Sequence, residues 1–188
     1  MIGAAPADLA DPQAVMVRRL AQLIEPQSAN KVVRRELVGR GRAHFPNTHF
    51  FEDIQFHTAV LSAAERVSFL HQPAFTYFRR YQRPQITGSS SDMRFDIIPV
   101  TRLTLDAFSR TAQFRDPLWR GAVLASCFRI LIWCGDVISH HYRDGFEQAA
   151  RALLRLIHPA YLQIPDDLPD GFEPLRAAQA YIRRLSDV

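Results

Sequence analysis

The most apolar stretch of the chain is GAVLASCFRILIWCG at residues 121–135, and it limits the possible folds more than any other segment. A helix that spans a membrane needs about 20 apolar residues, whereas Arg129 interrupts this shorter run. The stretch therefore predicts a helix buried in the core of a globular domain, inside a longer helix over 117–140. Asp116 and Pro117 form a typical helix start before it.

Two cysteines, Cys127 and Cys134, lie seven residues apart in this stretch. On a helix with a rise of about 1.5 Å per residue they are about 10 Å apart, too far for a disulfide. Free thiols are typical of a reducing compartment. Residues 1–13 lack the basic and apolar regions of a signal peptide. A cytoplasmic location is expected, and a peripheral position at the inner membrane face is compatible with it.

The composition is that of an ordinary globular domain. The chain has 188 residues, of which 47% are hydrophobic and 22% charged, enough for one core and too apolar for general disorder. The net charge is +4, and Lys31 is the only lysine beside 22 arginines. These arginines are dispersed rather than gathered in a stripe, so nucleic-acid binding is not expected.

Apolar spacing and helix-start residues predict seven helices. They lie near residues 12–25, 31–37, 53–66, 97–113, 117–140, 145–158 and 173–186. Between 67 and 79 the period changes, and valine and aromatic residues around Pro73 predict two short strands, 67–70 and 75–79. The predicted fold class is α+β, predominantly helical, with this strand pair followed by a C-terminal helical bundle. We expect a helical segment at 1–27, a middle region at 28–95 and a helical region at 96–188.

Four segments occur in an order found in one enzyme family. They are SANKVVRREL (28–37), HFPNTHFFEDIQFH (44–57), RVSFLHQPAFTYFRR (66–80) and RPQIT (83–87). Together they resemble bacterial family 2 glycosyltransferases, in which an NK-x-x-RR segment precedes an ED pair, a YxRR segment and a QIT loop. The resemblance covers roughly residues 26–110 and implies the acceptor-side, C-terminal half of a GT-A fold.

The resemblance also implies roles for individual residues. Asp53 would be the general base that takes the proton from an acceptor hydroxyl, and Glu52 would orient it or bind that hydroxyl. The remaining matched positions would contact the substrate or its diphosphate. They are Asn30, Lys31, Arg35, His57, Arg79, Arg80, Gln85 and Thr87.

The donor-side features of the family are missing. No D-x-D triplet occurs, no glycine-rich phosphate loop is present, and Ala29 replaces the bulky residue often found before NK. The chain alone is therefore expected to bind no cofactor and no metal. A divalent ion, Mg²⁺ or Mn²⁺, is expected in a complete enzyme, and activity only when a donor-binding half is supplied.

Simpler interpretations exist for the same residues. Glu52 and Asp53 stand at a helix start, where carboxylates cap free N–H groups. His57 lies one turn after Asp53 and could bind it, share a metal with it or be purely structural. Arg79 and Arg80 could protect an edge strand, and 83–92 could be an ordinary surface loop.

The leading functional hypothesis is a family 2-like glycosyltransferase fragment or split subunit. It would transfer a sugar from a nucleotide-sugar to an acceptor hydroxyl during cell-surface polysaccharide synthesis. The alternative is a non-catalytic helical interaction module derived from such an enzyme. Expected partners are the nucleotide-sugar, a carbohydrate acceptor, and either a donor-half protein or a second copy paired through the open strand edge. Neither nucleic-acid binding nor a membrane span is expected.

Overall fold

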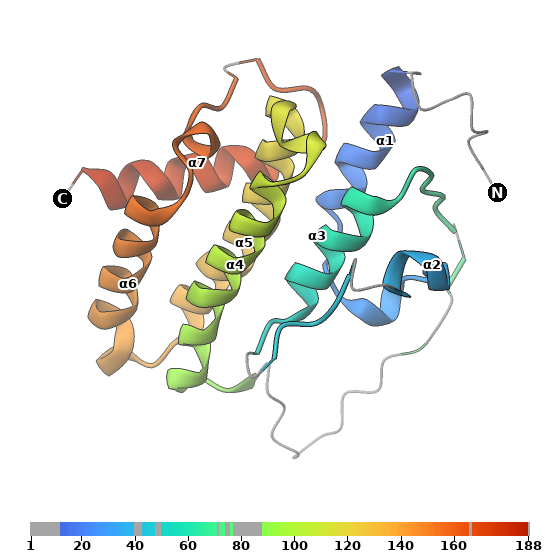
Figure 1. Ribbon diagram of the computed structural model, residues 1–188. Coiled ribbons are helices and arrows are strands. Elements are labelled where there is room, and N and C mark those ends of the chain that lie inside the picture. Colours follow the sequence, from blue (N-terminus) through green and yellow to red (C-terminus); the bar gives the residue numbers. More distant parts are fainter. Residues whose placement is uncertain are drawn as a thin grey trace.

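The computed structural model describes residues 12–39, 43–47, 50–70, 72–73, 76, 88–165 and 167–187. All regular elements in these ranges are helical (Figure 1). The α-helices are α1 (Pro12–Gln22), α2 (Arg35–Val38), α3 (Asp53–Ala63), α4 (Ile97–Ser109), α5 (Pro117–Val137), α6 (Arg143–Leu156) and α7 (Glu173–Ser186). Short 3-10 helices lie at Ser28–Asn30, Asp92–Asp96, Ala112–Arg115, His140–Tyr142 and Pro159–Leu162.

Six of the seven predicted helices are confirmed over most of their length, and α3, α5 and α7 begin where the sequence predicts. Of the helix predicted at 31–37, residues 31–34 are irregular and α2 begins only at Arg35. Local chemistry explains the start of α5. The Asp116 carboxylate accepts hydrogen bonds from the backbone N–H groups of Leu118 (3.0 Å) and Trp119 (3.3 Å), as an N-cap does. The Arg19 guanidinium of α1 donates to the same carboxylate, with Nε 2.8 Å from Oδ2. One aspartate therefore both starts α5 and ties α1 to it.

The core is built around α5, as the sequence predicts. Helices α1, α4 and α7 pack against it, and α3 packs against α4 (Figure 1). By length and composition α5 could cross a membrane, but 61% of its most apolar window is buried against other parts of the protein. Burial of this kind is typical of the central helix of a helical core.

The predicted strand pair is wrong for the residues that the structure describes. Residues 67–70 have no regular structure and no strand partner, and Leu70 is 64% exposed. The second predicted strand, 75–79, lies outside the described residues except for Thr76, which is irregular. A β-prone sequence forms a strand only where a neighbouring strand pairs with it, and the described residues provide none. The described fold is all-helical rather than α+β.

Both cysteines are buried free thiols on α5, as their spacing predicts. Burial raises the pKa of Cys134 to about 11, opposed by the guanidinium of Arg94, and it raises the pKa of Cys127 still further. A thiol with a raised pKa carries little thiolate and is unreactive. These cysteines are packing residues.

Candidate functional site

The acidic pair lies at the N-terminus of α3, directly after a strained residue. Phe51 has a φ of 68°, a left-handed conformation that costs a non-glycine residue about 1–2 kcal/mol. Tertiary contacts hold this conformation. The backbone N–H of Phe50 donates to Asp96 Oδ2 (2.9 Å), and the Phe51 ring contacts Trp133 edge-on, with centroids 6.4 Å apart. Contacts with Asp96 and Trp133 thus hold the two residues that precede Glu52 and Asp53.

Asp53 does not cap its own helix. Its Oδ1 accepts a hydrogen bond from the backbone N–H of Ser28 (3.1 Å), at the start of the 3-10 helix Ser28–Asn30. Within the described part of the chain, Oδ2 accepts no hydrogen bond. Glu52, the N-cap residue of α3, makes no side-chain capping bond either. The capping interpretation therefore holds for neither carboxylate at α3, although Asp53 satisfies a free N–H of the neighbouring element.

Lys31 interacts electrostatically with this carboxylate, although no ion pair joins the two in the described residues. Its ammonium donates to Asn30 Oδ1 (2.6 Å) and to the carbonyl oxygen of Gln27. Burial lowers the pKa of Lys31 to about 8, while attraction to Asp53 and Glu25 works in the opposite direction. The fold thus brings the segment of Asn30 and Lys31 to Asp53, which lies 22 or more positions further along the chain. The cluster combines a carboxylate with an amine that titrates near neutral pH.

His57 makes no hydrogen bond with the acidic pair in the described part of the chain. The side chain is only 1% exposed, and Nε2 lies 3.2 Å from the carbonyl oxygen of Gln22 on α1. Burial, followed by the charge of Lys31, lowers the pKa of His57 to about 3, so the ring is neutral at pH 7. A neutral ring donates from Nε2 to this carbonyl, and Nδ1 finds no partner among the described residues. His57 therefore forms no hydrogen bond with Asp53 and joins α1 to α3 instead.

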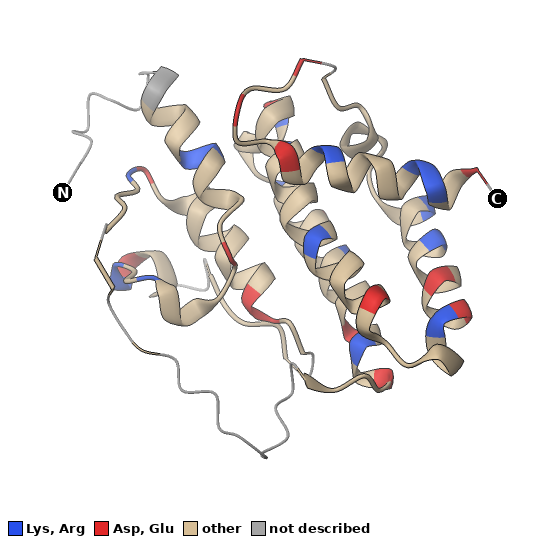
Figure 2. Cartoon of the chain, turned by 180° about the vertical axis from the view of Figure 1, so that it is seen from behind, with Lys and Arg blue, Asp and Glu red and all other residues tan. Residues whose placement is uncertain are grey.

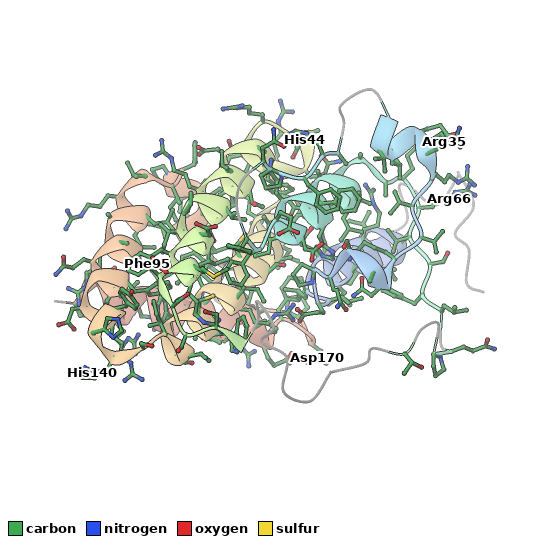
Figure 3. The ribbon with its side chains drawn as sticks, turned by 90° about the horizontal axis from the view of Figure 1, so that it is seen from below. Arg35, His44, Arg66, Phe95, His140 and Asp170 are labelled. Atoms are coloured by element: carbon green, nitrogen blue, oxygen red, sulfur yellow. The ribbon has the colours of Figure 1, made fainter. Side chains whose placement is uncertain are left out.

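The other predicted site residues are not gathered here. Arg35 lies on α2 and is exposed, and no hydrogen bond or ion pair joins it to Glu52 or Asp53 in the described ranges. Figure 3 shows Arg35 at the same end of the molecule as Arg66. The positions predicted to close over the diphosphate lie outside the described residues. They are Arg79, Arg80, Gln85 and Thr87.

No group of three or more His, Cys, Asp or Glu side chains in the described residues could hold a metal ion. Charged side chains of both signs are interspersed along the described helices (Figure 2). The acidic pair with Lys31 is therefore a small mixed-charge site, which suits proton transfer or the binding of hydroxyl groups more than it suits a divalent cation.

Sequence reasoning missed three residues that build this site. Phe51 gives no sequence signal, because phenylalanine rarely adopts positive φ. The backbone N–H of Ser28 gives no sequence signal for a role in the site, yet it is the partner of Asp53. Gln22 lies in an ordinary amphipathic helix pattern, yet it is fully buried and its carbonyl oxygen binds His57.

The fold and the site together define a helical protein with a strained turn that presents two acids beside a lysine. Comparison with known proteins adds no relative to this description: no protein-family model, no curated protein and no solved structure matches the chain.

Proposed function

We propose that this chain is the acceptor-side part of a family 2-like glycosyltransferase, with Asp53 as its general base. One observation carries the proposal: the Ser28 N–H binds Asp53 Oδ1 at 3.1 Å. This bond unites two of the segments that resemble the family, 28–37 and 44–57. Lys31 of the first segment lies within electrostatic range of Asp53 in the second. Supporting the same assignment, the strain at Phe51 lies directly before the acids, and backbone strain of this kind clusters at functional sites.

The proposed chemistry uses the free side of the Asp53 carboxylate. The acceptor hydroxyl would lie against Oδ2 and give it a proton as the hydroxyl oxygen forms a bond to the anomeric carbon. The bond from that carbon to the phosphate oxygen breaks at the same time, and its electron pair leaves with the nucleotide diphosphate. A positioned base contributes about 10²–10⁴-fold to such a step. Glu52 would accept a hydrogen bond from another acceptor hydroxyl.

The donor and its metal are assigned to a separate donor-binding half. The described residues do not fit a divalent ion, since they offer no suitable group of ligands. Neutralisation of the leaving diphosphate is usually a large catalytic term. The isolated chain is therefore proposed to be inactive, and activity would need the second half in trans or by fusion.

Asp53→Asn tests the role of the base. The amide oxygen of asparagine can still accept the Ser28 N–H, so the free energy of unfolding is expected to stay within about 1 kcal/mol. The amide cannot take a proton, so transfer should fall about 10²-fold or more. The measurement pairs urea unfolding with transfer of radiolabelled sugar from UDP-sugars to a panel of glycan acceptors, using the chain fused behind the donor-binding half of a family 2 glycosyltransferase.

Glu52→Gln is the matched control, because glutamine retains an acceptor oxygen for a substrate hydroxyl. Its transfer rate is expected to fall about 10-fold or less, well short of the loss expected for a base. Full activity in Asp53→Asn would contradict the proposal. A folded fusion protein that transfers no sugar to any acceptor would contradict it as well.

A second candidate function, the non-catalytic interaction module, is favoured by exposed apolar side chains. Most of the exposed large hydrophobic residues in the described ranges come from 24–70. They are Ile24, Val32, Val38, Phe45, Phe69 and Leu70. Large exposed apolar side chains are common in contacts with another protein. Under this alternative, Val32→Ser with Leu70→Ser would abolish partner binding, whereas Asp53→Asn would leave it unchanged.

A further inference from the structure

Exposed apolar side chains occur on two segments at one end of the molecule, residues 31–38 and 64–70. Val32 is fully exposed and Leu70 is 64% exposed, and Val38 and Phe69 are exposed as well. Figure 1 shows α2 and the chain that leaves α3 on the side of the molecule opposite α6, and Figure 3 places Arg35 and Arg66 at the same end. Both segments therefore lie on one end face, which we call the α2 end.

The α2 end is rich in exposed apolar side chains. Its 15 residues supply four of the ten exposed large hydrophobic side chains in the described ranges. Single exposed apolar residues are ordinary, but several on one face commonly mark a contact surface. None of the four lines the cavity that the described residues form between α3 and α4, so a small molecule bound in that cavity would leave them exposed.

The same end carries positive charge. Its charged side chains are three exposed arginines, a partly buried lysine and two exposed acids: Arg34, Arg35, Arg66, Lys31, Glu36 and Glu65. The 15 residues thus have a formal charge of +2, half of the +4 of the whole chain. No ion pair within the described residues engages Arg34 or Arg35, so both guanidinium groups are available to an outside partner.

Apolar and cationic side chains are neighbours on both segments, and this arrangement suits the surface of a bilayer. Val32 stands two residues before Arg34, and Phe69 stands three residues after Arg66. The planar guanidinium of arginine is weakly hydrated and binds phosphate oxygens with two parallel hydrogen bonds. It can therefore stay at the phosphate level of the headgroups while a neighbouring valine, phenylalanine or leucine enters the apolar layer below.

We propose that the α2 end docks on the surface of a bilayer that contains anionic phospholipid. Charge complementarity selects this occupant, because exposed apolar groups with an excess of arginine match a partner that offers both an apolar layer and phosphate groups. A bilayer is also planar and fluid, so it accepts side chains from two segments of one end face without a matching groove. The proposal does not rest on the glycosyltransferase assignment, and it gives the exposed apolar residues a lipid partner in place of a protein.

Vesicle co-sedimentation of the full chain tests the proposal. The vesicles contain either phosphatidylcholine alone or three parts of phosphatidylcholine to one part of phosphatidylglycerol. Binding to the anionic vesicles should be at least about 10-fold tighter, since each arginine near an anionic surface adds to the attraction. Raising the NaCl concentration from about 50 mM to about 500 mM should remove most of this preference, because salt screens exposed charges.

A fluorescent probe shows which face enters the bilayer. Both native cysteines are buried and react slowly with thiol reagents, so an added exposed cysteine is labelled selectively. A nitrobenzoxadiazole group on Leu70→Cys should become brighter and shift to shorter wavelength with anionic vesicles. The same group on Leu156→Cys should not respond, because Leu156 is exposed on α6, on the opposite side of the molecule.

A double substitution tests the contribution of charge. Arg34→Gln with Arg35→Gln should weaken binding to the anionic vesicles at least about 10-fold. The matched control is Arg110→Gln with Arg115→Gln, which removes the same charge from exposed positions at the connection between α4 and α5. The control should change the affinity about 2-fold or less, because charges away from the docked face are screened.

A second pair tests the contribution of the apolar side chains. Val32→Ser with Leu70→Ser should weaken binding at least about 10-fold, because less apolar surface leaves water. Leu103→Ser with Leu156→Ser changes leucines that are exposed elsewhere and should leave the affinity unchanged. Folding of each variant is checked by circular dichroism, and the probe on Leu70→Cys decides if a double variant fails to fold.

Several outcomes would overturn the proposal. They are no binding to anionic vesicles at low salt, an equal loss in both arginine pairs, and unchanged binding after Val32→Ser with Leu70→Ser, which would indicate adsorption by charge alone. A probe that responds on Leu156→Cys but not on Leu70→Cys would overturn it too. Binding of a protein partner without any binding to vesicles would overturn it in favour of the interaction module.

Discussion

Phe51 determines where the acidic pair points, although its ring has no part in the chemistry. Its positive φ turns the chain into α3 so that Asp53 reaches the Ser28 N–H. The Trp133 contact and the Phe50–Asp96 hydrogen bond stabilise that turn. A turn that is strained but held by several independent contacts is a rigid platform for a side chain, and the proposed base needs such a platform.

We predict that Phe51→Gly is more stable than Phe51→Ala by about 1 kcal/mol. Both variants lose the ring and its contact with Trp133, but only glycine adopts positive φ without strain. Urea unfolding measures the difference. The control is Gln148, an exposed residue inside α6, where alanine should be more stable than glycine by about 1 kcal/mol. An alanine variant at 51 that equals or exceeds the glycine variant would show that the turn is unstrained.

The helices pack closely where a glycine allows it, most clearly between α5 and α7. A Cβ atom built on Gly121 would lie 2.5 Å from Leu175 Cδ2, and Leu175 is itself fully buried. Leu175 cannot move aside without disturbing its own neighbours. Gly121 therefore permits the close approach of α7 to the central helix. A glycine inside a helix lowers its stability by about 1 kcal/mol relative to alanine.

Gly121→Ala is expected to destabilise the protein by about 1–3 kcal/mol, because overpacking outweighs the gain in helix propensity. Gly145→Ala is the matched control. Its added Cβ would meet only Phe95 Cζ at 3.7 Å, an ordinary contact, so this variant should be stabilised by up to about 1 kcal/mol. Thermal unfolding of both variants checks the prediction, and equal melting temperatures would contradict it.

The N-terminal helix is joined to the rest of the molecule through polar groups as well as apolar ones. Arg19 pairs with Asp116 at the start of α5. Buried groups join α1 to α3, where the carbonyl oxygen of Gln22 meets His57 and its amide donates to Thr58 Oγ1 (3.0 Å). His57 is stable in this position only while its ring is neutral. Burial and the positive charge of Lys31 both disfavour the protonated ring. The stability of the whole fold is thus linked to pH.

We predict a loss of stability as the pH falls from 6.5 toward 3. The pKa of His57 is lowered from 6.5 to about 3 in the folded state, so between these values the unfolded chain binds a proton that the folded chain does not. Protonation therefore favours unfolding, with a slope of at most about 1.4 kcal/mol per pH unit from this one group. His57→Gln, which can still donate to Gln22, should flatten the curve of unfolding free energy between pH 6.5 and 5.

The control for this experiment is His140→Gln. Because His140 is exposed, this variant should leave the slope of unfolding free energy against pH unchanged. All three proteins carry the same carboxylates, so the difference between the variants isolates the histidine. A slope that survives His57→Gln would show that His57 does not govern the acid side of the stability curve.

The absence of strands from the described residues changes the expected mode of association. Residues 67–70 form no strand, so the described residues provide no sheet edge through which a second copy could pair. Dimerisation through such an edge is therefore no longer expected. The exposed apolar residues between 24 and 70 provide a different basis for a partner contact. The boundaries at 27/28 and 95/96, the cytoplasmic location and the glycosyltransferase assignment all stay predictions.

The sequence alone determined where most of the helices lie and where α5 and α7 start. Asp116 with Pro117, and Glu173 with Pro174, act within a few residues of themselves, and such local signals need no distant partner. The apolar run at 121–135 likewise required a buried central helix, wherever the other helices lay. The meeting of residues 28–31 with the acidic pair was expected only through the family resemblance, because no local rule brings two such segments together.

The tertiary structure alone decided the rest. Residues 67–70 have strand propensity, but a strand needs hydrogen bonds from a neighbour that the described chain does not offer. His57 lies one turn from Asp53, yet its partner is Gln22, because the packing of α1 buried that side of α3. Phe51 adopts positive φ only because Trp133 and Asp96, more than 40 residues away, hold it there. Local propensities act within a turn of the chain, whereas these three outcomes depend on contacts that exist only after the helices have packed.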